Sequence, residues 1–234
     1  VREQLSPDTW PAVSALERAL APIRSAPRNP QRSPATDART ADRLLESLLA
    51  IQGIAAESMV RDPGWHLLDV GRRLERALFL VELLEATLGH RHSDAVDSLV
   101  LESVLIAGES IITYRRRNQA RANAETVLDL MLRDDGNPRS LAFQVRRLQA
   151  GLAAVPAPGR AGARDGLVAD LLDLVRELDT AVLAVADAGG LRRHLVDMLE
   201  STGWRLRELD TELTRTHFTH RSASQWPEVG PWQP

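Results

Sequence analysis

Two glutamates stand where a helix would normally bury apolar side chains, and their carboxylates could do chemistry there. Glu75 and Glu82 lie seven residues apart within residues 62–88, a stretch that has no helix breaker after its opening Asp-Pro-Gly turn. At about 100° per residue, the apolar residues of one helix face are Leu67, Leu68, Gly71, Leu74, Leu78 and Val81. Both glutamates project onto this face, and a carboxylate buried there needs a partner because an unpaired buried charge is costly.

Arg115 is the cation that could provide this partner. Residues 95–118 predict the following helix, and its inner face includes Gly108 and Ile111. Arg115 projects onto that face, within about a quarter turn of both residues. We therefore expect ion pairs between Arg115 and the two glutamates. Gly71 and Gly108, one on each helix, would let the two backbones approach closely.

Two interpretations of this polar centre are open. It is either a buried network that stabilises the fold, or a polar pocket that binds a ligand or completes the active site of a partner. A stand-alone enzyme would use Glu75 or Glu82 as a general base and Arg115 as an anion clamp. If the network is structural, Glu75→Ala should lower the free energy of unfolding by about 3–5 kcal/mol, because Arg115 would be left buried without a partner.

A run of arginines follows Tyr114, at residues 115–117 and again at Arg121. Guanidinium groups in such a run could bind phosphate groups or an acidic partner. A basic run at the C-terminal end of a helix is more often a solvated face that the helix dipole stabilises. For Arg116 and Arg117 we favour the solvated face.

Several other kinds of site are not predicted. The chain has no cysteine, which excludes disulfides, thiolate metal sites and cysteine nucleophiles. None of its glutamates has a histidine three residues later, the spacing that di-metal helical bundles use. Only His217 and His220 have a ligand-like spacing, so we expect neither a metal nor a cofactor. The chain also has no glycine-rich phosphate loop and no nucleophile elbow.

Composition favours an all-α fold. The 234 residues include 44% hydrophobic but only 4% aromatic side chains, and a chain rich in Ala and Leu suits helices packed on helices. The net charge of -3 gives no reason to expect nucleic acid or an anionic membrane as a partner. No apolar stretch reaches about 18 residues and no signal peptide is visible, so we expect a cytoplasmic protein.

Helical periodicity and capping signals define the expected elements. The helices cover residues 6–22, 37–61, 62–88, 95–118, 124–132, 138–152, 167–186 and 191–216. Asn137 is expected to cap the helix that starts at Pro138, and residues 25–34 and 154–166 are expected to be loops. We therefore predict an antiparallel bundle of about seven or eight helices in a single domain of residues 1–216, followed by an extended, disordered tail at residues 217–234.

Four motifs resemble those of the bacterial alpha-E domain, a predicted all-helical domain named for a Glu-Arg motif. They are Gly64-Trp65, residues 71–77 (GRRLERA), residues 109–117 (ESIITYRRR) and residues 137–144 (NPRSLAFQ). Their order and spacing agree along nearly the whole chain, although Asn118 stands where the family usually has an aromatic residue. Residues 1–6 are similar to the middle of the family's domain, so we expect this chain to lack the N-terminal helical region of that domain.

The resemblance implies a role beside another enzyme. Genes of the family typically neighbour, or are fused to, circularly permuted ATP-grasp proteins and transglutaminase-like proteins. This implies amide or peptide ligation, in which the ATP-grasp partner does the chemistry and the helical domain is a non-catalytic accessory that positions the substrate. The alternatives are a stand-alone enzyme with an interior Glu and Arg site, and a regulatory protein-interaction scaffold, which predicts a large exposed apolar patch.

The candidate site residues come from these motifs and from the helix faces. Glu75 and Glu82 are the catalytic candidates. The binding candidates are Arg72, Arg76, Tyr114, Arg115 and Arg139. No metal ligand is among them.

Overall fold

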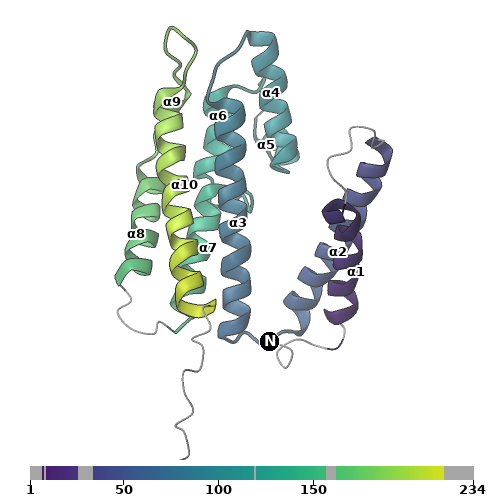
Figure 1. The fold of residues 1–234 in the computed structure, drawn as a ribbon. Helices are drawn as coiled ribbons and strands as arrows, with labels where there is room; N and C mark the ends of the chain where they lie inside the picture. The colour runs from purple at the N-terminus through teal and green to yellow at the C-terminus, as the bar shows by residue number, and fades with distance from the viewer. Residues whose placement is uncertain (1–6, 8, 26–33, 119, 157–161, 219–234) are drawn as a thin grey trace, which may run out of the picture. The chain divides into compact units, whose positions relative to one another are not determined.

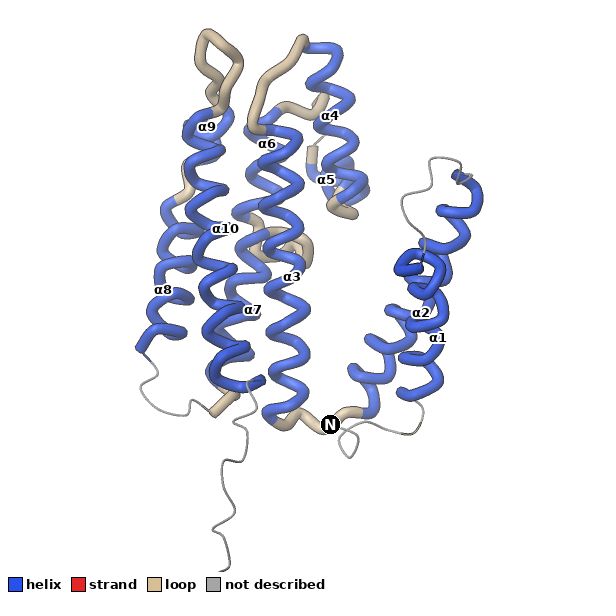
Figure 2. Tube along the Cα trace, in the orientation of Figure 1, coloured by secondary structure: helices blue, strands red, loops and turns tan. Residues whose placement is uncertain are grey.

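The structure is a computed structural model, and it describes residues 7, 9–25, 34–118, 120–156 and 162–218 of the chain. Its regular elements are helices (Figures 1 and 2). In chain order they are α1 (Thr9–Ser25), α2 (Pro34–Ser58), α3 (Pro63–Leu88), α4 (Asp94–Ala107), α5 (Ile111–Arg117), α6 (Ala124–Leu128), η2 (Asp129–Arg133), α7 (Leu141–Ala153), α8 (Gly162–Glu177), α9 (Thr180–Ala184), α10 (Arg193–Leu213) and η3 (Thr214–Phe218), where η marks a π-helical segment. Apart from an isolated β-bridge between His90 and Leu191, these ranges contain no β-structure, which confirms the all-α class.

The chain forms two compact units, residues 1–68 (unit 1) and residues 69–234 (unit 2). Helix α3 begins in unit 1 and continues as part of unit 2. The expectation of one helical domain over residues 1–216 stays a prediction.

In unit 1, helices α1 and α2 pack side by side as a hairpin (Figure 1). Arg61, just after α2, donates hydrogen bonds to the carbonyls of Ala55 (3.2 Å) and Ala56 (2.6 Å), acceptors that a helix end leaves open. Its guanidinium lies 4.1 Å from the ring centroid of Trp65, whose indole donates to the Ala55 carbonyl at 3.1 Å. Asp62 accepts a hydrogen bond from the Trp65 backbone at 3.0 Å, and this contact fixes the start of α3.

In unit 2, the four long helices α3, α7, α8 and α10 form an antiparallel bundle, in which neighbouring helices run in opposite directions (Figure 1). Helix α7 packs on α8, and α8 packs on α10. Between α10 and α3, a Cβ atom at Gly203 would lie 3.4 Å from a methyl group of Val81, so the glycine allows a close approach. Between α3 and α7, the Arg73 guanidinium lies 5.4 Å from the Phe143 ring centroid. The predicted antiparallel bundle is confirmed.

The interior of unit 2 is built mainly from aliphatic side chains. The buried residues of α3 are Asp69, Val70, Arg73, Leu74, Ala77, Leu80, Val81, Leu84 and Leu88. They share one core with Val145 of α7, Leu171 of α8 and Leu206 of α10, none of which is exposed. Because each fully buried leucine contributes about 1.5–3 kcal/mol of transfer free energy, this shared core is the main source of stability.

The helix expected over residues 95–118 is two helices, α4 and α5. Glu109 lies between them with a φ of 49°, a left-handed conformation that ends α4. A Cβ atom at Gly108 would collide with the side chain of Met131, so this glycine allows a close approach to η2 and not to α3. Gly71 is exposed with open space around it, and its predicted role in helix packing is wrong.

Other helices also begin at residues that differ from the prediction. The helix expected over residues 167–186 is interrupted before α9, where Asp179 accepts a hydrogen bond from the Ala181 backbone at 3.0 Å. The cap of α7 is Ser140, whose hydroxyl accepts from the Phe143 backbone at 3.1 Å, so the predicted start at Pro138 is wrong. These interruptions explain why the described residues form ten α-helices instead of seven or eight.

Parts of the expected loops and of the expected tail lie outside the described residues, at 26–33, 157–161 and 219–234. Inside stretches that were expected to be loops, α1 continues to Ser25, α2 begins at Pro34 and α8 begins at Gly162. His217 and Phe218 were expected to open the tail, but they belong to η3.

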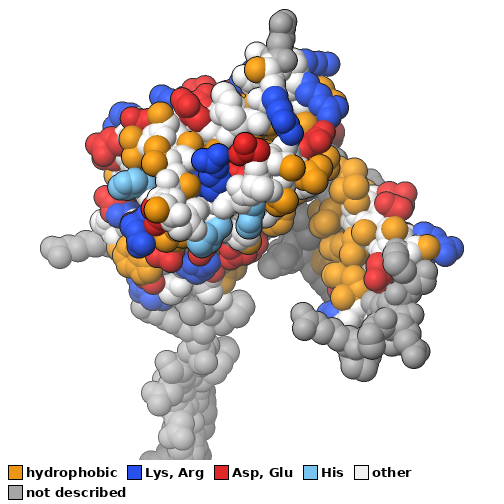
Figure 3. All heavy atoms as spheres, turned by 90° about the horizontal axis from the view of Figure 1, so that it is seen from above, with side chains coloured by type: hydrophobic (Ala, Val, Ile, Leu, Met, Phe, Trp, Pro, Cys, Tyr) orange, Lys and Arg blue, Asp and Glu red, His pale blue; other side chains and the backbone are white. Residues whose placement is uncertain are grey.

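A buried arginine joins four helices at one end of unit 2. Arg192 is 3% exposed and donates hydrogen bonds to the carbonyls of Leu88 (3.0 Å) and His90 (3.1 Å). It also donates to the Ala184 carbonyl at 3.3 Å and forms an ion pair with Asp97 at 2.8 Å. This one side chain therefore connects α3, α4, α9 and α10. The outer surface of the same end mixes basic, acidic and histidine side chains (Figure 3).

We expect Arg192→Met to lower the free energy of unfolding by about 3–5 kcal/mol, because it leaves the largely buried Asp97 carboxylate without its cation. Urea denaturation followed by circular dichroism measures this change. Arg193→Met removes an exposed arginine one residue later, and it should change the free energy by less than about 0.5 kcal/mol. Similar losses in the two variants would contradict the structural role of Arg192.

Candidate functional site

The three charged residues expected to meet inside the bundle lie on its surface. Glu75 is exposed. Glu82 pairs with Arg207 at 3.1 Å, and Arg115 pairs with Glu102 at 2.6 Å, with all four side chains between 46% and 63% exposed. The predicted interior network is therefore wrong. Glu75→Ala is therefore not expected to destabilise the fold strongly, because an exposed carboxylate contributes little to stability.

The error lies in the rotation of α3 about its axis. The residues that α3 buries include Asp69, Val70 and Ala77, and their common direction lies about 100° from the predicted face, which is the angle of one residue step. Glu75 and Glu82 then point away from the interior. The correct face has apolar residues along the whole of α3, whereas the predicted face ends at Val81.

The charged residues that α3 does bury are Asp69 and Arg73, with side chains 4% and 11% exposed. Asp69 accepts a hydrogen bond from Arg72 and forms an ion pair with Arg73 at 3.2 Å. Arg147 of α7 lies 3.9 Å from the other carboxylate oxygen. One carboxylate thus holds three guanidinium groups. Our sequence reasoning missed Asp69, although arginines three and four residues after an acid are spaced for helical ion pairs.

The Asp69 carboxylate is ionised at neutral pH. Burial opposes its ionisation, but the hydrogen bond from Arg72 and the charge of Arg73 outweigh burial and hold the pKa of Asp69 below its ordinary value of 3.8. Burial lowers the pKa of Arg73, and Asp69 raises it. The guanidinium of Arg73 nevertheless remains charged, because arginine does not lose its proton in proteins.

A second arginine-bearing segment is the loop between η2 and α7. Arg139 in this loop pairs with Glu109 of the turn between α4 and α5. Asn137 is 3% exposed and fixes the loop by donating hydrogen bonds to the Ser110 hydroxyl and to the Leu130 carbonyl, each at 3.1 Å. Its side-chain oxygen accepts from the Arg139 backbone at 3.1 Å. The same network therefore sets the positions of Glu109 and Arg139.

Arg76 completes a group of five arginines that we call the arginine cluster: Arg72, Arg73, Arg76, Arg139 and Arg147. Burial lowers the pKa of Arg76, and the positive charges of Arg139, Arg73 and Arg72 lower it further. Glu109 has the opposite effect on the pKa of Arg76. Arg76 is partly buried, and it has no ion pair or hydrogen bond with another described residue. With Asp69 and Glu109 as its acids, the cluster has an excess of positive charge.

The arginine cluster has the chemistry of an anion site. Guanidinium groups donate in a planar fork that matches carboxylate and phosphate oxygens. Arg72, Arg76 and Arg139 come from two separate sequence motifs, and the structure brings them together. Their role in binding stays a prediction.

The remaining two binding candidates lie elsewhere. Tyr114 is buried, and its hydroxyl lies 2.7 Å from the hydroxyl of Thr126. Arg115 is held on the surface by Glu102. Neither residue belongs to the arginine cluster.

Within the part of the chain that the structure describes, no group of three or more His, Asp or Glu side chains is placed to hold a metal ion. Burial and the charge of Arg164 lower the pKa of His217 below 6.5. His220, its predicted companion, lies outside the described residues. None of the described helices has the length and apolar character needed to cross a membrane.

The fold and the site are those of an all-helical domain with an arginine cluster. One arginine of this cluster, Arg76, belongs to the sequence pair Glu75-Arg76. The chain belongs to the Alpha-E family, whose model matches residues 1–218 and is described as a predicted alpha-helical domain with a conserved ER motif. Among its relatives are proteins of Mycobacterium tuberculosis and Mycobacterium bovis, each named an uncharacterized protein and each 35% identical over 233 residues. The match covers all of this chain but 26% of each relative, so the chain spans about a quarter of their length. No solved structure matches the chain.

We expect Asp69→Asn to lower the free energy of unfolding at pH 7 by about 1.5–3 kcal/mol, because the hydrogen-bonded charge pairs are lost. A depressed pKa in the folded state means that this stability is present above pH 3.8 and is lost as the pH falls through the folded pKa. The difference between wild type and variant should therefore shrink below about pH 4. Urea denaturation at pH 7, 5 and 3 measures it, with the exposed Asp197→Asn as control. A difference that does not change with pH would contradict this account.

Proposed function

We propose that this chain is a non-catalytic accessory domain that positions an anionic substrate for a circularly permuted ATP-grasp ligase in amide or peptide ligation. The ligase would be fused to the domain or separate from it, and a transglutaminase-like protein would be a second member of the system. The identity of the partners comes from the family resemblance, and the role of this domain comes from the arginine cluster. The proposal places the system in the cytoplasm, where ATP is available to the ligase.

The observation that supports this role is the environment of Arg76. A partly buried guanidinium with three arginines near it and no ion pair of its own among the described residues has positive charge that the negative charge of a bound anion could neutralise. Asp69 cannot supply this charge, because three other arginines already share it. A bound anion would reduce the repulsion and add charge-assisted hydrogen bonds.

The chemistry of amide ligation fits an anion-binding role for the arginine cluster. An ATP-dependent ligase activates a carboxylate, so its substrate has the anionic group that arginines bind best in a planar geometry. The Nε groups of Arg72 and Arg73 are also buried without hydrogen-bond partners. The cluster therefore contains donors that Asp69 does not use.

The two alternative functions differ in their support. A stand-alone enzyme would need Glu75 or Glu82 beside Arg115. Glu82 and Arg115 instead form ion pairs with other residues, and Glu75 is exposed on the surface. A regulatory scaffold predicts exposed apolar surface, and the outer side of α4 exposes Val96 and Leu99. The scaffold alternative stays a prediction.

We expect Arg76→Met to weaken anion binding by about tenfold or more, since a hydrogen bond to a charged group contributes about 1.5–3 kcal/mol. Succinate and inorganic phosphate are the two probes, titrated at low ionic strength and followed by NMR chemical shifts. Tighter binding of succinate identifies a carboxylate site, and tighter binding of phosphate identifies a phosphate site. Equal binding by wild type and variant would overturn the assignment.

Two controls separate binding from folding. Arg116→Met removes an exposed arginine outside the cluster and should leave both affinities unchanged. Arg76→Met should not lower the melting temperature, because it removes repulsion between cations. A large loss of stability in Arg76→Met would indicate a structural role.

We also expect the domain to increase ADP release by its ATP-grasp partner in the presence of the carboxylate substrate. Adding wild type or Arg116→Met to the partner should raise the rate, and adding Arg76→Met should raise it less at low substrate concentration. The coupled assay would show this as a higher KM with a similar kcat, because the cluster binds the substrate and does no chemistry. No increase with the wild-type domain would contradict the accessory role.

A further inference from the structure

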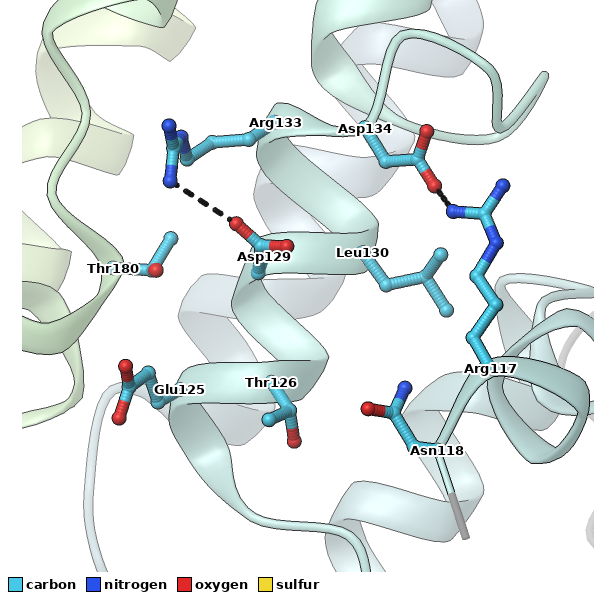
Figure 4. Close-up of a pocket in the computed structure, with 9 residues that line it drawn as sticks. All are labelled: Arg117, Asn118, Glu125, Thr126, Asp129, Leu130, Arg133, Asp134 and Thr180. Carbon is cyan, nitrogen blue, oxygen red and sulfur yellow. Dashed lines mark hydrogen bonds and ion pairs between the residues drawn. The ribbon is translucent and has the colours of Figure 1, made fainter.

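A second polar site lies outside the arginine cluster. It is a cavity of about 340 Å³ formed where the end of α5, the segment α6–η2 and the start of α9 meet (Figure 4). The residues that line it are Arg117, Asn118, Glu125, Thr126, Asp129, Leu130, Arg133, Asp134 and Thr180. Leu130 is the one apolar member of this set. The volume lies near the lower end of the range for small-molecule sites.

The charges that line the cavity are not balanced. Arg133 forms an ion pair with Asp129 at 3.2 Å, and Arg117 forms one with Asp134 (Figure 4). Glu125 is exposed to solvent and has no ion pair with another described residue. The cavity therefore has one carboxylate more than it has guanidinium groups, and this carboxylate is Glu125.

Thr180 provides an independent indication of a ligand. It is 5% exposed, yet it lines the cavity from the start of α9 and its hydroxyl makes no hydrogen bond with another described residue. In Figure 4 the side chain projects toward the wall that carries Asp129 and Arg133. The residue is almost fully buried, and its hydroxyl leaves a donor and an acceptor open at the cavity, so a ligand there would supply the hydrogen bond that the protein does not.

The π-helical segment explains why these side chains share one wall. In η2 the Asp134 backbone donates to the Asp129 carbonyl at 3.2 Å, a bond between residues five apart. Such a widened turn shifts the side chains that follow it, and π-helical turns occur frequently at functional sites. On the floor of the same region, the Thr126 hydroxyl is held by buried Tyr114 at 2.7 Å. These bonds set the positions of Thr126 and of the η2 side chains without a ligand.

We propose that this cavity binds a small protonated organic amine that also has hydrogen-bonding groups. The ammonium group would pair with Glu125, and the hydroxyl of Thr180 and the amide of Asn118 would bind the polar remainder. A metal ion is a poorer match, because Asp129 and Asp134 are already held by arginines and a hard cation takes several oxygen ligands. The site is separate from the arginine cluster and does not depend on the function proposed for it.

Glycinamide is the probe, because it combines one ammonium group with an amide and fits a cavity of this size. N-acetylglycinamide is the matched uncharged compound. In NMR titrations of the full chain, glycinamide should give saturable shifts at α6 and α9, and N-acetylglycinamide should bind about tenfold more weakly or worse. Equal binding of the two compounds, or no saturation by either, would overturn the proposal.

The variants assign the binding to the named residues. Glu125→Gln should weaken glycinamide binding by about tenfold or more, and the exposed Glu200→Gln should leave it unchanged. Thr180→Val preserves the side-chain shape without the hydroxyl and should weaken binding with Glu125 intact. Arg76→Met should have no effect, which separates this site from the anion site. Unchanged affinity in both Glu125→Gln and Thr180→Val would show that the amine binds elsewhere.

Discussion

The buried carboxylate of Asp69 is the interaction on which the arrangement of charges in unit 2 depends. A lone carboxylate inside a helical bundle would be strongly unfavourable, so it draws in Arg72 and Arg73 from its own helix and Arg147 from α7. These contacts join α3 to α7 and surround the Asp69 carboxylate with three guanidinium groups. Arg76 lies one helical turn after Arg72. It has no ion pair with another described residue, and the positive charges of the neighbouring arginines repel it. The same carboxylate that stabilises the bundle therefore leaves one guanidinium uncompensated.

The sequence was sufficient to locate the helices, but it was not sufficient to predict which face of α3 is buried. Apolar spacing and caps predicted α2, α3 and α10 within a few residues, because these helices are long and strongly periodic. The predicted face of α3 was wrong by one residue step, because the buried face includes Asp69 and Arg73 and the predicted face included neither. A buried ion pair makes two charged residues compatible with a core, and the spacing of Asp69 and Arg73 on one helix already allowed such a pair. The structure brings three of the binding candidates, Arg72, Arg76 and Arg139, together, and their role in binding stays a prediction.

Helix interruptions were the second feature that local signals could not predict. Residues 95–118 have continuous apolar spacing, yet α4 ends because Gly108 lies against Met131 of η2 and Glu109 takes a left-handed conformation. The π-helical turn of η2 has no spacing signal of its own, because its residues also fit a regular helix. The end of α4 depends on a contact between residues far apart in the chain. The cavity beside η2 was missed for the same reason.

The loop of residues 134–140 connects the two polar sites. Asp134 lines the cavity, and its backbone carbonyl accepts hydrogen bonds from the Ser140 hydroxyl at 2.5 Å and from the Asn137 backbone at 3.2 Å. Arg139 in the same loop belongs to the arginine cluster. Because Asn137 and Ser140 both bind the carbonyl of Asp134, and Asn137 also accepts from the Arg139 backbone, one hydrogen-bonded loop positions Asp134 and Arg139. The motif of residues 137–144 supplies Arg139 to the arginine cluster, and its Asn137 and Ser140 also bind the backbone of Asp134 at the cavity, so a shift of its backbone would affect both sites.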